Sequence, residues 1–161
     1  MKPQEIQVGR FYHDGKAGLR EVIAIDGAPT RVRYRLLAAK VERQFDRHGV
    51  EKSALGVEST MTLAAFAAWA KAAYGAQEGA IVLLGLQAAR IKLSPGEKAF
   101  IDSLRAEYRD EPFTTGTLIS YDHTEGRAVA GLEKKGLVRR ANSGEVEILP
   151  LGMARLNALP A

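Results

Sequence analysis

The most constraining feature of the sequence is the run 122–138, which predicts a short helix followed directly by a strand. A capping-box pattern opens the helix at Asp122, and Gly136 ends it. Val129 and Leu132 lie three positions apart and would face inward. A helix that stops at a glycine and leads straight into a strand allows few arrangements of the neighbouring chain.

A longer helix is predicted upstream of this run. In Ser94-Pro95-Gly96-Glu97, serine takes the cap, proline the first helical position and glutamate the capping-box position. The signal Asp110-Glu111-Pro112 would end this helix. Its buried stripe is predicted to contain Phe100, Ile101, Leu104 and Tyr108.

Three further elements are predicted around these two helices. Thr114 or Thr115 would cap a short second helix, with Leu118 and Ile119 in its core. Segments 137–140 and 145–149 predict a β-hairpin, and 151–159 predicts a last helix that packs against the first. This order of elements predicts a winged helix-turn-helix domain over residues 93–161.

The end of this region is similar to a known pattern. Leu132-Glu133-Lys134-Lys135-Gly136-Leu137-Val138, then a hairpin, then Ile148-Leu149-Pro150-Leu151-Gly152, resembles the winged-helix domain of multiple-antibiotic-resistance-type (MarR-type) transcriptional regulators. The resemblance covers roughly residues 93–159 and implies a DNA-binding fold.

Some positions depart from that family. Glu125 and Gly126 stand where an apolar residue and a small polar residue are usual, and Leu149 replaces a threonine. The family's long dimerisation helices have no counterpart, so the resemblance implies the fold more than it implies a ligand response.

Residues 1–75 predict a small β-barrel-like module with a packed helix. Short apolar-polar segments at 6–12, 18–25, 29–37 and 50–55 are separated by turn signals. Segment 41–45 fits a strand or a helix. An alanine-rich stretch, Ser59 to Tyr74, predicts a helix that Gly75 ends and that places Phe66, Trp69, Ala70 and Ala73 on one inward face.

The Phe66-x-x-Trp69-Ala70 pattern loosely resembles small-barrel modules of uncharacterised phage and prophage proteins. Residues 76–92 form a connecting segment, read either as a helix or as a surface that pairs with a second copy in a homodimer. Its apolar run, Gly79 to Leu86, is too short to span a bilayer. The overall prediction is an α+β chain: a small β-barrel-like module with a packed helix, then a winged helix-turn-helix.

The excess of positive over negative charge lies in the N-terminal half of the sequence. The chain carries a net charge of +4 and a sequence pI of about 9.4, which suits an anionic partner. Residues 1–73 hold 12 Lys and Arg against 8 Asp and Glu, whereas residues 74–161 hold 11 of each. The C-terminal half, which contains the predicted winged helix, is therefore neutral as a whole, and any DNA contact there depends on local clusters.

Such a cluster is predicted on the helix of the 122–138 run and on the hairpin. Arg127 is the candidate for a two-pronged guanine contact, with Thr124 and His123 beside it. Lys134, Lys135, Arg139 and Arg140 would contact phosphates. The alternative reading is that these are ordinary solvated charges.

A second basic patch is predicted in the N-terminal half. The alternation in Arg31-Val32-Arg33-Tyr34-Arg35-Leu36 puts Arg31, Arg33 and Arg35 on one face of a strand, with Arg20 as a candidate neighbour. This patch could contact a nucleic-acid backbone, or it could be the outer face of a half-exposed strand.

Nothing in the sequence indicates an enzyme, a cofactor or a metal site. There is no cysteine, and His13, His48 and His123 lie too far apart for metal-ligand spacing. No phosphate loop, dinucleotide fingerprint or nucleophile elbow occurs. The N-terminus has no apolar signal-peptide core, so the expected location is cytoplasmic, without a membrane partner.

The sequence therefore predicts a protein that binds double-stranded DNA, a transcriptional regulator or accessory factor of phage or mobile-element origin. The alternative is a protein-interaction adaptor in which the barrel and the winged helix are docking modules. The neutral C-terminal half favours this alternative, because a DNA reader usually gathers positive charge on its recognition surface.

Overall fold

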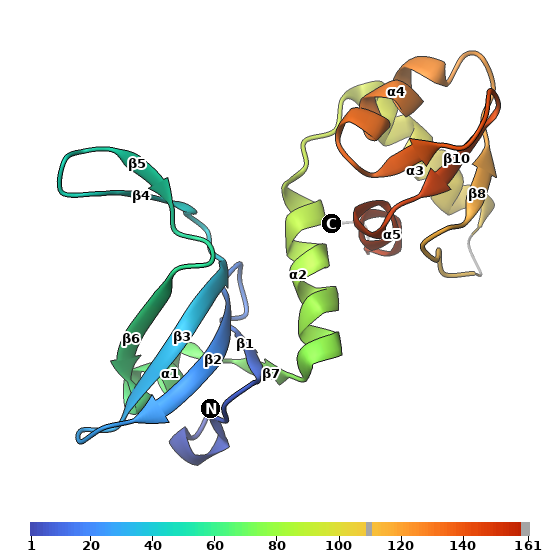
Figure 1. Cartoon of the computed structure of the whole chain (residues 1–161). Coiled ribbons are helices and arrows are strands. Elements are labelled where there is room, and N and C mark those ends of the chain that lie inside the picture. The colour runs from blue at the N-terminus through green and yellow to red at the C-terminus, as the bar shows by residue number, and fades with distance from the viewer. Residues whose placement is uncertain (109–110, 159–161) are drawn as a thin grey trace. The chain divides into compact units, whose positions relative to one another are not determined.

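The computed structural model describes residues 1–108 and 111–158, and the chain divides into two compact units, Met1–Leu83 and Leu84–Ala161. Both units mix helices with antiparallel strands, so the chain is α+β (Figure 1). Each unit has its own cluster of buried apolar side chains. Among the described residues, no helix combines the length and the apolar character needed to cross a bilayer.

The first unit is built on a five-stranded antiparallel sheet with the order β6-β3-β2-β1-β7. Strands β6 and β7 form its two edges, so the sheet is open and does not close into the predicted barrel-like form. Its strands are β1 (Phe11–His13), β2 (Leu19–Asp26), β3 (Arg31–Ala38), β6 (Glu58–Thr62) and β7 (Ala72–Tyr74).

The predicted alternation on β3 is confirmed for its first half. Val32 and Tyr34 are buried, while Arg31 and Arg33 are exposed. The pattern weakens at Leu36, which is only half-buried and lies beside an irregularity in the pairing with β2. A register shift changes which side chains face the core, because side chains alternate strictly along a regular strand.

The helix predicted from Ser59 to Tyr74 is much shorter in the structure. Only Leu63–Trp69 is helical (α1); the chain before it is β6 and the chain after it is β7. Thr62 caps α1, its side chain accepting a hydrogen bond from the Ala65 amide at 3.3 Å. The segment before α1 pairs with β3, and the segment after it pairs with β1, where strand pairing outweighs the helix propensity of Ala72 and Ala73.

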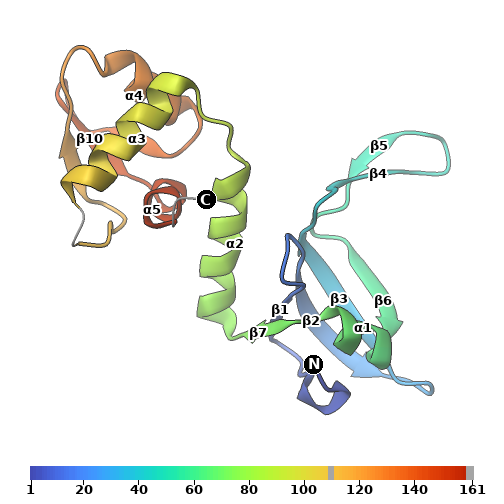
Figure 2. The ribbon, with the colours of Figure 1, turned by 180° about the vertical axis from the view of Figure 1, so that it is seen from behind.

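Helix α1 covers one face of the sheet (Figure 2). Phe66 is fully buried there and meets Tyr12 edge-on, with ring centroids 5.4 Å apart. Trp69 is partly buried against the same cluster, as predicted for a core-facing tryptophan. At the N-terminus, a 3-10 turn at Pro3–Glu5 precedes β1, so the predicted first strand at 6–12 begins later than expected.

A separate hairpin projects from the end of β3 and β6 (Figure 1). It consists of β4 (Arg43–Phe45) and β5 (Glu51–Ser53), so segment 41–45 is a strand and not a helix. All six strand residues are exposed. A two-stranded hairpin without a packed face is only marginally stable in water.

The predicted connecting segment, 76–92, is mostly one helix, α2 (Ala76–Arg90). Beyond it, the second unit runs in the order helix, strand, helix, hairpin, helix. Its elements are α3 (Pro95–Glu107), β8 (Leu118–Ser120), α4 (Gly126–Lys134), β9 (Val138–Arg140), β10 (Glu145–Ile148) and α5 (Pro150–Asn157). The predicted first helix, hairpin and last helix are confirmed, although Asp110 and Leu159 lie outside the described residues.

The predicted second helix is wrong: its core residues form strand β8. Ile119 is buried and pairs with Val146 of β10, whereas Leu118 is 54% exposed. Gly116 has a φ of +89°, which breaks the backbone conformation of a right-handed helix. The three strands form a sheet with the order β8-β10-β9.

The helix predicted to start at Asp122 starts at Gly126. The preceding turn is held by Asp122, whose Oδ1 accepts hydrogen bonds from the Thr124 amide at 2.7 Å and the Glu125 amide at 3.1 Å. In the reciprocal hydrogen bond, the Oε2 of Glu125 accepts from the Asp122 amide at 3.0 Å. The capping-box residues are therefore bonded as predicted, but they fix a turn ahead of the helix.

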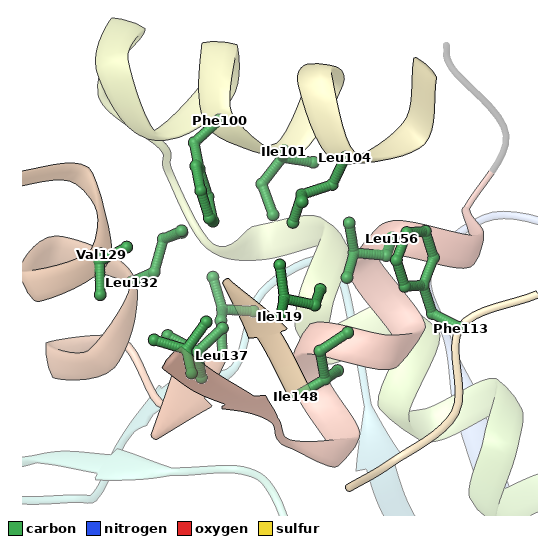
Figure 3. Close-up of a cluster of buried hydrophobic side chains, with 12 residues drawn as sticks. Phe100, Ile101, Leu104, Phe113, Ile119, Val129, Leu132, Leu137, Ile148 and Leu156 are labelled. Carbon is green, nitrogen blue, oxygen red and sulfur yellow. The ribbon is translucent and has the colours of Figure 1, made fainter. Parts of the chain in front are cut away.

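One apolar core joins the helices to the three-stranded sheet of the second unit. Figure 3 shows its side chains pointing inward from α3, α4, β8, β10 and α5. Tyr108 is not part of it, contrary to the sequence prediction: it is 38% exposed and packs on the Phe113 ring. The buried members are Phe100, Ile101, Leu104, Phe113, Ile119, Val129, Leu132, Leu137, Val138, Val146, Ile148 and Leu156.

Helix α5 approaches Leu137, the residue before β9, so closely that only glycine fits at the contact. A side chain on Gly152 would overlap the backbone carbonyl of Leu137. That carbonyl already accepts a hydrogen bond from the Leu149 amide at 3.1 Å, so it cannot move away without loss.

We expect Gly152→Ala to lower the free energy of unfolding by about 1–3 kcal/mol, because overpacking displaces backbone atoms. Urea unfolding followed by circular dichroism measures this change. Gly126→Ala is the matched control, since a side chain there meets open space. Equal stability of the two variants would show that α5 does not pack on the backbone of Leu137 as described.

Candidate nucleic-acid interface

Helix α4 has one buried side and one cationic side. Val129 and Leu132 are fully buried in the core. Arg127 and Lys134 are exposed and lie seven positions, about two helical turns, apart, which places them on the same side of the helix. Within residues 1–108 and 111–158, neither side chain has an ion-pair or hydrogen-bond partner. Their charges are therefore available to an outside ligand.

Lys135 has a different role from the predicted phosphate contact. Its ammonium pairs with Glu97 at the start of α3, a carboxylate that is only 5% exposed. Burial raises the pKa of Glu97, but hydrogen bonds from Lys135 and from the Ser94 amide outweigh this effect and hold the pKa below its ordinary value. Lys135 thus stabilises the contact between two helices.

Gly131 completes the same contact. A side chain at this position would overlap the Glu97 carboxylate, so the glycine lets α4 approach α3 closely. The pair of residues, Glu97 and Lys135, is 38 positions apart in the sequence. The capping box identifies one role of Glu97, but no sequence pattern reveals its ion pair.

Both hairpin arginines also have carboxylate partners. Arg139 donates to Glu147 on the paired strand, at 3.1 Å from Nε and 2.5 Å from Nη2. Arg140 lies 3.5 Å from Glu133 at the end of α4. Exposed ion pairs of this kind contribute about 0–1 kcal/mol, so a phosphate could displace the carboxylates, but the hairpin presents little net charge.

The turn before α4 is well ordered by its own hydrogen bonds. The Thr124 hydroxyl donates to Asp122 at 2.5 Å, and this bond is the main reason that the pKa of Asp122 lies below its ordinary value. His123 is exposed beside Asp122. Thr124 lines the same hollow as Arg127, but the Thr124 hydroxyl proton already bonds to Asp122.

A shallow hollow of about 590 Å³ opens between the beginnings of α3 and α4. Arg127 and Glu125 line it from one side, and Phe100 forms part of its apolar wall. The remaining lining residues are small: Ser94, Gly96, Ala99, Ser103, Thr124 and Ala128.

The second predicted patch is largely balanced by acidic neighbours. Arg35 lies between Glu21 at 3.2 Å and Glu58 at 3.1 Å, and Glu58 is also 4.0 Å from Arg33. Arg31 donates to the Thr60 hydroxyl at 3.4 Å. The three arginines share one face, as the alternation predicts, but they do not form a strongly positive surface.

Arg20 does not join this stripe. Its guanidinium is stacked on the other face of the sheet between Tyr34 and Trp69, 4.4 Å and 3.9 Å from the ring centroids. Burial lowers its pKa from the ordinary value. Sequence reasoning missed this stack because its residues come from β2, β3 and α1, which only the fold brings together.

No protein-family model, no curated protein and no solved structure matches the chain at a significant level. The MarR-type and phage-module resemblances therefore stay predictions from the residues. In the part of the chain that the structure describes, no group of three or more His, Asp or Glu side chains could hold a metal ion.

We expect Lys135→Met to lower the free energy of unfolding by about 1–3 kcal/mol, because the buried Glu97 carboxylate loses its partner. Lys134→Met, one position earlier and exposed, should change stability by less than about 0.5 kcal/mol. Urea unfolding of both variants at pH 7 measures the difference.

The same pair gives a pH dependence. Folding lowers the pKa of Glu97, so the ionised Glu97 carboxylate adds to the free energy of unfolding at neutral pH. This stabilisation is lost as the pH falls through the lowered pKa. The stability gap between the wild type and Lys135→Met should therefore narrow in acid. A gap that is constant from pH 7 to pH 3 would show that Lys135 acts through packing alone.

Proposed function

We propose that the C-terminal unit binds double-stranded DNA in the manner of a winged helix, with α4 as the recognition helix and the β9–β10 hairpin as the wing. The observation that carries this proposal is the pair Arg127 and Lys134. These uncompensated cations share the exposed side of a helix whose other side is locked into the core. In DNA-binding helices of this type, early residues meet base edges and flanking cations meet phosphates.

The structure changes which predicted contacts the proposal includes. Arg127 stays the base-reading candidate and Lys134 the phosphate contact. Lys135 is not included as a DNA contact, because it forms an ion pair with Glu97. Arg139 and Arg140 would have to break their ion pairs with Glu147 and Glu133 before they could bind a phosphate. With few free cations, affinity is expected to be modest and strongly dependent on salt.

The biological role that fits this proposal is a transcriptional regulator or an accessory factor. Winged helices commonly bind paired half-sites as dimers, so the proposal includes self-association. The exposed Ile81 on α2 is a candidate contact for a second copy.

We expect Lys134→Ala to weaken binding of a mixed-sequence 20-bp duplex and to reduce the salt slope by about one unit, the change expected for one lost phosphate contact. Arg127→Ala should weaken binding about tenfold. Fluorescence anisotropy of the full chain across a salt series measures both effects.

Lys16→Ala is the matched control for that experiment. It removes one exposed cation from a turn of the first unit and should leave both the affinity and the salt slope nearly unchanged. If Lys16→Ala weakens binding as much as Lys134→Ala does, non-specific attraction explains the binding and α4 is not the recognition helix.

A second candidate function, a protein-interaction adaptor, is favoured by the β4–β5 hairpin. Phe45 and Val50 are 67% and 54% exposed there, and Val41 beside the hairpin is 67% exposed. Its charges are largely matched within the hairpin, through Arg43 with Glu51 and Lys52 with Asp46. An exposed hairpin that presents apolar side chains and carries low net charge suits a protein partner better than a phosphate backbone.

If this hairpin is a docking surface that is uncovered in the free protein, its backbone amides should exchange with solvent far faster than those of β2 and β3. Hydrogen–deuterium exchange with mass spectrometry measures this directly. Protection of β4 and β5 equal to that of the main sheet would show that the hairpin is already covered in solution.

A further inference from the structure

The carboxylates around α4 and the hairpin differ in how they are compensated. Glu97 pairs with Lys135, Glu133 with Arg140, and Glu147 with Arg139. Glu145 accepts a hydrogen bond from the Asn142 side chain at 2.5 Å. Among the described residues, Glu145 and Glu125 therefore have no cation within ion-pair distance, and the Oε2 of Glu125 accepts a hydrogen bond from the Asp122 amide at 3.0 Å.

Glu125 and Arg127 are close in the sequence but not paired with each other. Both line the hollow between α3 and α4. An uncompensated carboxylate on a DNA-facing surface lowers general affinity for DNA, because it repels phosphates. Such a carboxylate can accept a hydrogen bond from DNA only where the DNA presents a donor, and the ionised phosphodiesters of the backbone present none.

We infer that Glu125 and Arg127 together read one G·C base pair, an inference that rests on the proposed DNA binding. In the major groove, guanine presents two acceptors, O6 and N7, which match the two-pronged donor of arginine. Cytosine presents the N4 amino donor, which a glutamate accepts. One donor fork and one carboxylate on the same hollow therefore complement the two halves of this pair.

The local structure holds the two side chains in position for this task. The Asp122 amide fixes one oxygen of Glu125 and leaves Oε1 open. Small neighbours, Gly96, Ala99 and Ala128, keep the hollow open, and a side chain added at Gly96 would meet no other atom within 4 Å. Specificity then comes from attraction to the correct pair and from repulsion of base edges that offer only acceptors.

The test is selection of duplexes with a randomised centre by the full wild-type chain, followed by sequencing of the bound pool. We expect enrichment of one G·C pair. Glu125→Gln keeps an oxygen for the Asp122 amide but removes the charge, and it should reduce the preference at that pair about tenfold while weakening the preference at other positions little. Thermal unfolding checks that the variant is folded.

Glu145→Gln is the matched control, because it removes the same charge from the hairpin, outside the hollow. It should strengthen binding to all sequences alike and leave the sequence preference unchanged. If Glu125→Gln behaves in the same way, Glu125 only repels phosphates and the inference is wrong.

The outcomes for the wild type separate the two proposals. Salt-dependent binding without any enriched sequence keeps the proposed function and overturns base reading by Glu125 and Arg127. Absence of binding at low salt overturns the proposed function, and base reading with it.

Discussion

The arrangement of the C-terminal unit depends on one buried carboxylate. Glu97 closes the capping box of α3 by accepting the Ser94 amide, and it pairs with Lys135, the residue that follows α4. Gly131 leaves the space that this carboxylate occupies. A buried charge is tolerated only when it is paired and hydrogen-bonded, so these contacts fix the distance between α3 and α4. With that distance fixed, the apolar side chains of α3 and α4 pack in a single arrangement in the core of the unit.

That geometry determines which charges are left for function. Lys135 pairs with Glu97 of α3, whereas Arg127 and Lys134 of α4 have no ion-pair partner among the residues that the structure describes. The hairpin arginines are matched by Glu147 and Glu133. A count of basic residues along the sequence therefore overstates the positive surface, and the structure reduces a seven-residue candidate site to a smaller group around the start and the outer side of α4.

The first unit shows the same difference between composition and surface. Most of the excess positive charge lies in its sequence, yet Arg35 and Arg33 share acidic neighbours on adjacent strands, and Arg20 is stacked between two aromatic rings. Stacking and ion pairing of this kind stabilise the sheet and leave less charge for a ligand. The exposed β4–β5 hairpin is the more unusual surface of this unit, and the sequence predicted a strand at 50–55 but left 41–45 open between a strand and a helix.

Local patterns in the sequence determined four features: helix α3 with its capping box, the β9–β10 hairpin, the last helix and the inward residues of β3. Caps, turns and alternation act over a few residues, so they can be recognised without the fold. Tertiary structure alone decided the rest. The alanine-rich stretch became helix and strands, and Leu118 with Ile119 became β8, because pairing with distant strands outweighed local propensity. The partners of Glu97, Arg20 and Arg35 likewise come from distant positions, so only the folded chain shows which charges remain free.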